Sequence, residues 1–408
     1  MKTSTRTRAE SSLLVLISLA LLLTLASTLP DGAMGASLEW TRKYNDKADG
    51  ADTWRSVAAA PDGSVYAAGI VYISGGTEYI NLIKYSSAGK KIWKRTYDTG
   101  TGNDRAYGVA AGPDGSVCVV GHTTPGGLSA TDIWVRKYSP KGKVKWTDSY
   151  GTTYGYSWEY GNGVAVAPDG SIYAVGATLV ENEGRNVWLR KYGPKGKVKW
   201  TKTYNRSMDG GASQDDGYGV AVAPNGRIYV VGTSSTTAQG YDLWLIKVSP
   251  KGALKKSKTF NEPGSTLDDI GHSVAAAPDG SVYVTGYSTS APGDRKFLVV
   301  KYSSRLKRRW YRTVDKGSGW DTGRGVAVGP DGGLYAAGYV YTTGTADDIW
   351  LRKYTPGGKT VWTKRCNGKA GGYDNAYGVA VTPLGEIYLA GGLYEDAGGH
   401  NAWLRKYR

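Results

Sequence analysis

The chain contains few of the residues that most often build metal, redox or nucleophilic sites. Only two cysteines and three histidines occur among its 408 residues. His122, His272 and His400 are widely separated, and the sequence has no His-Glu-x-x-His, Gly-x-Ser-x-Gly or Walker-type motif. The acidic segment 46–52 lacks the ligand spacing of a calcium loop. The sequence therefore predicts no catalytic residues, no metal site and no cofactor. Cys118 and Cys366 fall in different repeats of the chain, which argues against a disulfide between them.

Long hydrophobic runs are also scarce, and the one clear case lies near the start. Residues 13–25 are apolar and follow Lys2, Arg6 and Arg8. Thirteen residues are short for a membrane span but typical of a signal peptide. We therefore expect residues 1–36 to direct export to the periplasm, the medium or the cell surface, with no transmembrane domain after their removal. Cleavage near residues 33–35 or 24–26 and retention as an uncleaved anchor all stay open.

Glycine, tyrosine and tryptophan are abundant, with 59, 31 and 14 copies, and they recur with a period. The clearest marker is Val-Ala followed by a proline turn, in most copies Pro-Asp-Gly. Seven copies lie 52 to 56 residues apart, with prolines at Pro61, Pro113, Pro168, Pro224, Pro278, Pro330 and Pro383. A period of this length containing strand patterns is typical of a β-propeller, in which each repeat forms one blade.

Each repeat carries four strand patterns. In the copy at 163–204 the segments 164–167 and 171–175 flank a Pro-Asp-Gly turn, and 187–192 and 198–204 flank a Gly-Pro-Lys-Gly turn. Both pairs read as hairpins. The first two strands are rich in small residues and the outer two in aromatics, as expected where blades diverge from a central axis. The predicted fold is therefore all-β: a seven-bladed β-propeller of four-stranded antiparallel blades over residues 37–408.

The two ends of the repeat region complement each other. Residues 403–408 match a third strand with no fourth after it, and residues 38–44 match the fourth-strand pattern. We expect the N-terminal strand to pair in the last blade and close the ring, since this removes an open sheet edge.

The net charge of +16 is concentrated in the second hairpins, for example at Lys195, Lys197 and Lys199. A basic rim could attract an anionic partner. Lysines also protect exposed edge strands from pairing with other sheets. We favour edge protection because the lysines recur from blade to blade.

Two other charges recur in every repeat. An acid lies five residues before the first-strand valine, at Asp52, Asp104, Glu159, Asp215, Asp269, Asp321 and Asp374. A lysine occupies one third-strand position, at Lys84, Lys137, Lys191, Lys247, Lys301, Lys353 and Lys406. One group per blade does not make a converging site, so both sets are interpreted as structural. The acids are suited to accept main-chain N–H groups, and the lysines to pair with acids or lie across aromatic rings.

The complete repeat resembles the bacterial and archaeal β-propeller repeat family called SBBP. The resemblance covers residues 38–408 and is carried best by the second hairpins at 134–150 and 188–204. It implies exported, often surface-associated proteins without a shared catalytic activity, and it supplies no catalytic residues. Blade 5 departs from the pattern at Leu298, Val300 and Lys256, and blade 1 at Asn81.

A ligand site is better sought at equivalent positions that differ between blades. The position two residues before the first-strand valine meets this condition and is predicted to line the mouth of the central channel. Its residues are Arg55, Tyr107, Asn162, Tyr218, His272, Arg324 and Tyr377. Together they offer donors, stacking faces and positive charge for a sugar, a carboxylate or an acidic polymer end. The alternative is that they only plug the channel.

The sequence as a whole favours an exported, monomeric, non-catalytic module that binds an anionic glycan, a cell-wall polymer or a protein partner. A propeller enzyme, either a lyase or a quinoprotein-like oxidoreductase, is the alternative. The Gly-Lys-x-x-Trp segments resemble a quinoprotein docking motif, but the preceding Ala-x-Asp and an adjacent cysteine pair are missing. Nucleic-acid binding is disfavoured because export separates the protein from that partner.

Overall fold

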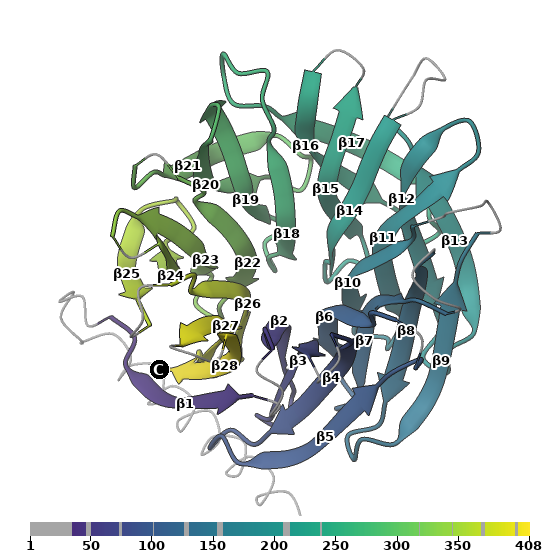
Figure 1. Cartoon of the computed structure of the whole chain (residues 1–408). Helices are drawn as coiled ribbons and strands as arrows, with labels where there is room; N and C mark the ends of the chain where they lie inside the picture. Colours follow the sequence, from purple (N-terminus) through teal and green to yellow (C-terminus); the bar gives the residue numbers. More distant parts are fainter. Residues whose placement is uncertain are drawn as a thin grey trace, which may run out of the picture. The chain divides into compact units, whose positions relative to one another are not determined.

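The computed structural model describes residues 35–408 apart from 46–49, 73–75, 101, 126–129, 153–157, 207–212, 237–238, 318, 345, 369–371 and 396–398. The predicted signal peptide lies almost wholly outside the described residues. Residues 36–408 form one compact unit of β-strands, whose sheets lie side by side around a common centre (Figure 1). No helix long and apolar enough to cross a membrane occurs among the described residues.

The described residues form 28 strands, which group into six sheets. The first two sheets contain β2 (Thr53–Ala59), β3 (Val65–Tyr72), β4 (Glu78–Tyr85), β5 (Lys91–Tyr97); and β6 (Arg105–Ala111), β7 (Val117–Thr123), β8 (Asp132–Tyr138), β9 (Val144–Tyr150). An eight-stranded sheet contains β10 (Tyr160–Val166), β11 (Ile172–Val180), β12 (Gly184–Tyr192), β13 (Val198–Tyr204), β14 (Ser213–Val222), β15 (Ile228–Thr236), β16 (Gln239–Val248) and β17 (Leu254–Phe260). The last three contain β18 (Ile270–Ala276), β19 (Val282–Ala291), β20 (Asp294–Tyr302), β21 (Arg308–Val314); β22 (Thr322–Val328), β23 (Leu334–Thr342), β24 (Ala346–Tyr354), β25 (Thr360–Cys366); and β26 (Asn375–Val381), β27 (Ile387–Glu395), β28 (Gly399–Tyr407), β1 (Leu38–Tyr44).

The predicted pair of hairpins per repeat is confirmed, although several strands are longer than predicted. In the repeat at 163–204, β11 continues to Val180 and β12 begins at Gly184, because Thr178 pairs with Asn186 and Leu179 with Arg185. The sequence predicts a loop between the strand patterns at 171–175 and 187–192, and several residues there are polar. They extend the ladder because main-chain pairing does not require apolar side chains once the strands are aligned.

One sheet differs from the predicted four strands. β12 pairs with β13 along its length but also forms two parallel pairs with β14, Gly184 with Ser213 and Arg185 with Gln214. This short contact joins two four-stranded units into one sheet of eight. The physical reason is the extension of both strands beyond their predicted starts, which brings their ends alongside each other.

The predicted pairing of the chain ends is present. β1 runs antiparallel to β28, with Trp40 opposite Lys406 and Arg42 opposite Leu404. Ser37 N donates to Arg408 O at 2.7 Å, and Arg408 N donates to Ser37 O at 2.9 Å. The outer edge of β28 is therefore covered by a strand from the other end of the chain.

The hydrophobic cores lie between neighbouring sheets. One cluster packs Trp54 and Ile83 of the first sheet against Tyr388 and Leu404 of the last. Outer-strand tryptophans contribute a second contact between repeats, because each reaches the hairpin turn of the next repeat. Trp40 Nε1 donates to Ser87 O at 3.0 Å, and a Cβ on Gly89 would lie 3.0 Å from the Trp40 ring. The same tryptophan-on-glycine contact joins Trp93 to Gly142, Trp146 to Gly196, Trp200 to Gly252 and Trp310 to Gly358.

One of these contacts is replaced by a complementary pair. Lys256 stands in place of the tryptophan, and the buried Leu306, at φ 56°, stands in place of the glycine in the facing turn. A bulky side chain in the turn fills the space that the missing indole leaves. Lys256 lies in β17 and pairs with Lys247 of β16, so its assignment to the fifth blade was wrong and it belongs to the fourth repeat. Leu298 and Val300 of the fifth are buried in the neighbouring core.

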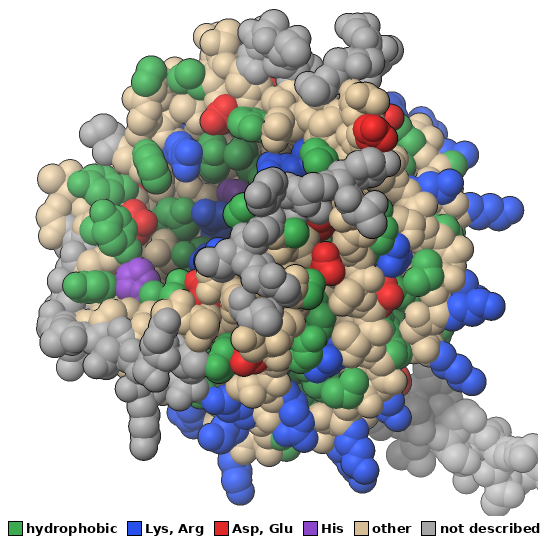
Figure 2. Space-filling model, turned by 45° about the vertical axis from the view of Figure 1, so that its right-hand side comes forward, with side chains coloured by type: hydrophobic (Ala, Val, Ile, Leu, Met, Phe, Trp, Pro, Cys, Tyr) green, Lys and Arg blue, Asp and Glu red, His purple; other side chains and the backbone are tan. Residues whose placement is uncertain are grey.

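The lysine-rich turns and strands lie at the outer edge. β9, β13, β17 and β21 each hydrogen-bond to one neighbouring strand only, and Lys195, Lys197 and Lys199 are exposed. Figure 2 shows Lys and Arg side chains projecting along this edge. Cys118 and Cys366 are free, as predicted.

Candidate functional site

The seven predicted mouth residues share one backbone feature. In the first strand of each repeat the register shifts across the predicted position, for example between Trp54 and Ser56 around Arg55. The same shift occurs around Asn162, His272 and Arg324. Each residue is therefore the extra residue of a β-bulge, a device that turns a side chain away from the regular alternation of the strand. The side chain placed by the bulge differs from one repeat to the next.

A glycine faces each bulge from the second strand. It follows the mouth residue by 14 positions, at Gly69, Gly121, Gly176, Gly232, Gly286, Gly338 and Gly391. A Cβ on any of them would lie 1.7 to 2.0 Å from a main-chain oxygen of the first strand. The bulge presses its carbonyl against this position, so only a residue without a Cβ fits.

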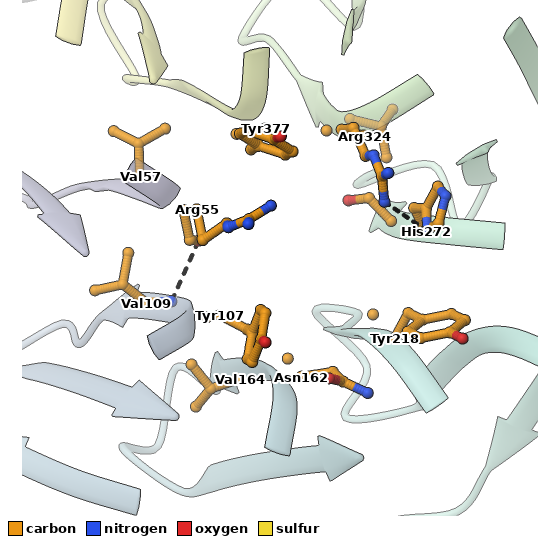
Figure 3. Close-up of a pocket in the computed structure, with 18 of the residues that line it drawn as sticks. Arg55, Val57, Tyr107, Val109, Asn162, Val164, Tyr218, His272, Arg324 and Tyr377 are labelled. Atoms are coloured by element: carbon orange, nitrogen blue, oxygen red, sulfur yellow. Dashed lines mark hydrogen bonds between the residues drawn. The ribbon is translucent and has the colours of Figure 1, made fainter. Parts of the chain in front are cut away.

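The seven bulged residues come together, as the sequence predicted. Arg55, Tyr107, Asn162, Tyr218, His272, Arg324 and Tyr377 alone line a cavity of about 280 Å³. We call them the mouth residues. They also line, with their strand neighbours, an adjoining cavity of about 270 Å³. Figure 3 shows the labelled side chains around one opening. All seven are partly buried, and ligand binding there stays a prediction.

Stacking and hydrogen bonds hold the two arginines in place. The Arg55 guanidinium lies over the Tyr377 ring at 4.4 Å from its centroid. Arg324 Nη2 donates to Tyr339 Oη at 3.1 Å, and Arg324 Nη1 lies 3.5 Å from His272 Nδ1 (Figure 3). Asn162 Nδ2 donates to Gly217 O at 2.9 Å. These contacts leave Arg55 Nε, Arg324 Nε and His272 Nε2 buried without a hydrogen-bond partner among the described residues.

The seven residues that line the mouth cavity include two arginines and no acid. Neither Arg55 nor Arg324 forms an ion pair with any described residue, whereas the nearby Asp216 is paired with Arg185 at 2.5 Å. Burial lowers the pKa of His272 well below its usual range, and Arg324 and Arg295 lower it further, so the imidazole is neutral at pH 7. The arrangement thus offers two cations, one neutral imidazole and three tyrosines to a ligand.

The recurrent acids are structural, as predicted. All seven are fully buried, and most accept main-chain N–H groups. Asp321 Oδ1 accepts Tyr341 N at 2.7 Å, and Oδ2 accepts Lys316 N at 2.9 Å. Burial raises the pKa of Asp269 and of Asp321 to about 7. Because the pKa of these two carboxyls is higher in the folded than in the unfolded chain, their protonation stabilises the fold. This contribution to the free energy of unfolding is complete below pH about 4 and is lost as the pH rises towards 7. The described residues contain no cluster of three or more potential metal ligands.

The recurrent lysines occupy the opposite end of the strands. Lys84 pairs with Asp62 at 3.1 Å and lies over the Tyr66 ring at 5.2 Å. Lys353 pairs with Asp331 at 2.6 Å and lies over the Tyr335 ring at 5.2 Å. Ion pairing and ring contacts were both predicted, and both occur.

We expect Asp374→Asn to lower the free energy of unfolding by about 1–3 kcal/mol. The Asp374 carboxylate accepts Gly368 N and, at 3.0 Å, Tyr394 N. An amide has one acceptor oxygen, so its NH₂ group would face a donor. Urea titration measures the loss, and the exposed Glu181→Gln serves as the control. An unchanged stability, or a bound cation lost with Asp374, would contradict the structural role.

Sequence reasoning missed a second variable set beside the mouth. It lies six residues before each recurrent lysine and comprises Glu78, Thr131, Arg185, Tyr241, Arg295, Asp347 and His400. Arg295 contacts the strand start of the next repeat, where Asp321 N donates to Arg295 O at 3.0 Å. Counting back from the lysine would have found this set, because the spacing is constant.

No family model matches the chain, and no curated protein matches it. A protein of unknown function from Dyadobacter fermentans matches at 13% identity and TM-score 0.53, over 92% of this chain and 99% of its own. A mutant α-L-arabinofuranosidase from Fusarium graminearum, in complex with an iminosugar inhibitor, matches at 12% identity and TM-score 0.51, over 91% and 98%. The β-propeller domain of the Trilobed protease from Pyrococcus furiosus matches at 11% identity and TM-score 0.47, over 91% and 94%. At such identities the similarity concerns the fold alone.

Proposed function

We propose that this chain is an exported binding module that holds an acidic group of a glycan or cell-surface polymer at the mouth cavity. The observation that carries the proposal is the convergence of Arg55 and Arg324, partly buried and without ion-pair partners among the described residues, on one cavity. A buried cation with unused donors is stabilised by an anion that brings its own acceptors. The cavity of about 280 Å³ lies at the lower limit for small-ligand sites and suits one sugar unit or one carboxylate.

The proposal includes a closed, seven-bladed ring. Two observations support it: β1 covers β28, and a hydrophobic cluster packs the last sheet onto the first. The two parallel pairs between β12 and β14 are a local contact between adjacent blades. A rigid ring of this kind holds the mouth residues at fixed positions before a ligand arrives, which lowers the entropic cost of binding.

Membership of the SBBP repeat family and export are further parts of the proposal. Both rest on the sequence: the repeat pattern over residues 38–408 and the apolar run at 13–25 behind three cations. A glycan or other polymer outside the cytoplasm is a partner that such a protein would meet. A protein partner that presents a carboxylate would use the same chemistry.

The test is the double variant Arg55→Ala with Arg324→Ala. The purified residues 37–408 are applied to an array of acidic and neutral polysaccharides and cell-wall polymers. We expect the wild-type protein to retain an acidic polymer, and the double variant to lose at least about tenfold in affinity, because each charge-assisted hydrogen bond contributes about 1.5–3 kcal/mol.

A rim variant provides the matched control. Lys195→Ala with Lys197→Ala removes two exposed cations from the outer edge and should leave specific binding unchanged at physiological salt. If the rim variant loses binding and the arginine variant does not, with equal melting temperatures, the site lies on the rim and not at the mouth.

An enzyme acting at the same mouth is the second candidate. Asp347, in the second variable set, is partly buried, and burial together with Asp348 raises its pKa to about 6. A carboxyl with such a pKa can act as a general acid near neutral pH. Release of reducing sugar or unsaturated product from a polymer that binds, lost in Asp347→Asn, would establish this function.

A further inference from the structure

A second cleft is formed by the segment before β18, the β19–β20 hairpin and Trp320, which precedes β22. Trp320, Arg295, Asp268, Thr289 and Gly293 are among the residues that line it, and its volume is about 410 Å³. Trp320 is 56% exposed, although large apolar side chains are normally covered. It does not lie loosely on the surface. The Arg295 guanidinium lies over its ring at 4.5 Å, and Arg295 bridges to Trp320 in parallel.

The polar groups of this cleft are set close to the exposed ring. Arg295 lines the cleft and forms no ion pair with any described residue. Asp268 Oδ1 accepts Tyr241 N at 2.9 Å, which fixes the carboxylate and leaves its second oxygen as an acceptor. A pyranose ring has an apolar C–H face that stacks on an indole, and adjacent hydroxyl groups that bind a paired donor and acceptor. We propose that this cleft is a sugar-binding subsite, with Trp320 as its platform and Arg295 and Asp268 as its polar contacts.

Side-chain contacts link the subsite to the mouth. Arg295 also lies over the Tyr287 ring at 4.3 Å, and Tyr287 contacts His272, with ring centroids 5.8 Å apart. His272 in turn contacts Arg324. One row of aromatic and cationic side chains therefore leads from Trp320 to the mouth cavity. In this respect the inference rests on the proposed function and deepens it: the ligand is an oligosaccharide of at least two units, with an acidic group at the mouth and a neighbouring ring on Trp320.

The test uses oligogalacturonides of one to four units and cello-oligosaccharides of the same lengths, with binding measured by calorimetry. We expect affinity for acidic oligosaccharides to rise with length in the wild-type protein. Trp320→Ala should lower the affinity for the tetramer about tenfold, because the variant loses both the stacking contact and the apolar area that the indole would bury against a sugar ring. The same change should leave the affinity for the monomer unaltered.

Trp158→Ala is the matched control. Trp158 is 49% exposed and bridges in parallel to Thr131, the position equivalent to Arg295, so it has the same backbone setting without the arginine. Its loss should not change binding. Equal affinity of wild type and Trp320→Ala for the acidic tetramer would overturn the subsite. If the double variant Arg55→Ala with Arg324→Ala still lost affinity for that tetramer, the proposed site at the mouth would remain supported. Trp320-dependent binding of the neutral tetramer, without binding of acidic oligosaccharides, would support the subsite and overturn the proposed acidic ligand. Absence of binding by both series would overturn both.

Discussion

Removal of residues 37–45 is expected to abolish the cooperative unfolding of this protein. These residues include β1, which pairs with β28 and also contacts the sheet of β2–β5. Arg42 Nε donates to Gly89 O at 2.7 Å, and Glu39 pairs with Lys406 at 2.9 Å. Tyr44 lies against the buried Trp54, with ring centroids 5.4 Å apart. The deletion therefore uncovers a strand edge and a hydrophobic contact at the same time.

The loss should approach the whole stability of a typical domain, about 5–15 kcal/mol, because a repeat array depends on every interface with its neighbours. Circular dichroism melts and gel filtration of 46–408 against 37–408 measure it. We expect aggregation through the exposed edge of β28, and recovery of the monomer when a peptide of residues 37–45 is added. A soluble protein that melts within a few degrees of 37–408 would show that β1 does not close the structure.

The repeat made most of the fold predictable. Strand pairing depends on alternation and turns, and both recur in each copy, so an error in one copy is corrected by the others. The pairing of residues 38–44 with 403–407 was predictable for the same reason, since the last repeat lacks a fourth strand and residues 38–44 match the fourth-strand pattern. The parallel contact of Gly184 and Arg185 with β14 was not predictable, because it arises in one copy from the lengths of two strands.

The sequence predicted which residues line the candidate site but not the β-bulge that places their side chains there. Positions that vary within a constant repeat identified Arg55, His272 and Arg324, and these line one cavity. The bulge that turns them inward leaves no residue pattern of its own, apart from the glycine 14 positions later. The Trp320 cleft was missed because it combines residues of successive repeats, from Gly240 in β16 to Trp320 before β22, and spacing within one repeat does not indicate such a contact.

The dependence of the mouth on its facing glycines leads to the second large effect. Gly338→Ala should destabilise the protein by at least about 3 kcal/mol, since overpacking against main-chain atoms cannot be relieved by a change of rotamer. The new Cβ would lie 2.0 Å from Thr322 O, 2.9 Å from Phe297 Cε2 and 3.0 Å from Gly323 Cα. Either β22 and β23 separate locally, or the bulge at Arg324 is lost and its side chain leaves the mouth.

The control for this change lies in the same sheet. Gly357 has no backbone strain, and its nearest neighbour to a new Cβ would be Thr355 Oγ1 at 3.7 Å, an ordinary contact. Gly357→Ala should therefore stay within about 0.5 kcal/mol of the wild-type protein in urea titrations. If Gly338→Ala matched this control, the facing glycine would not be needed for the bulge. If it instead melted far below the control and also lost binding of the acidic polymer, the same contact would support both the fold of β22 and β23 and the placement of Arg324.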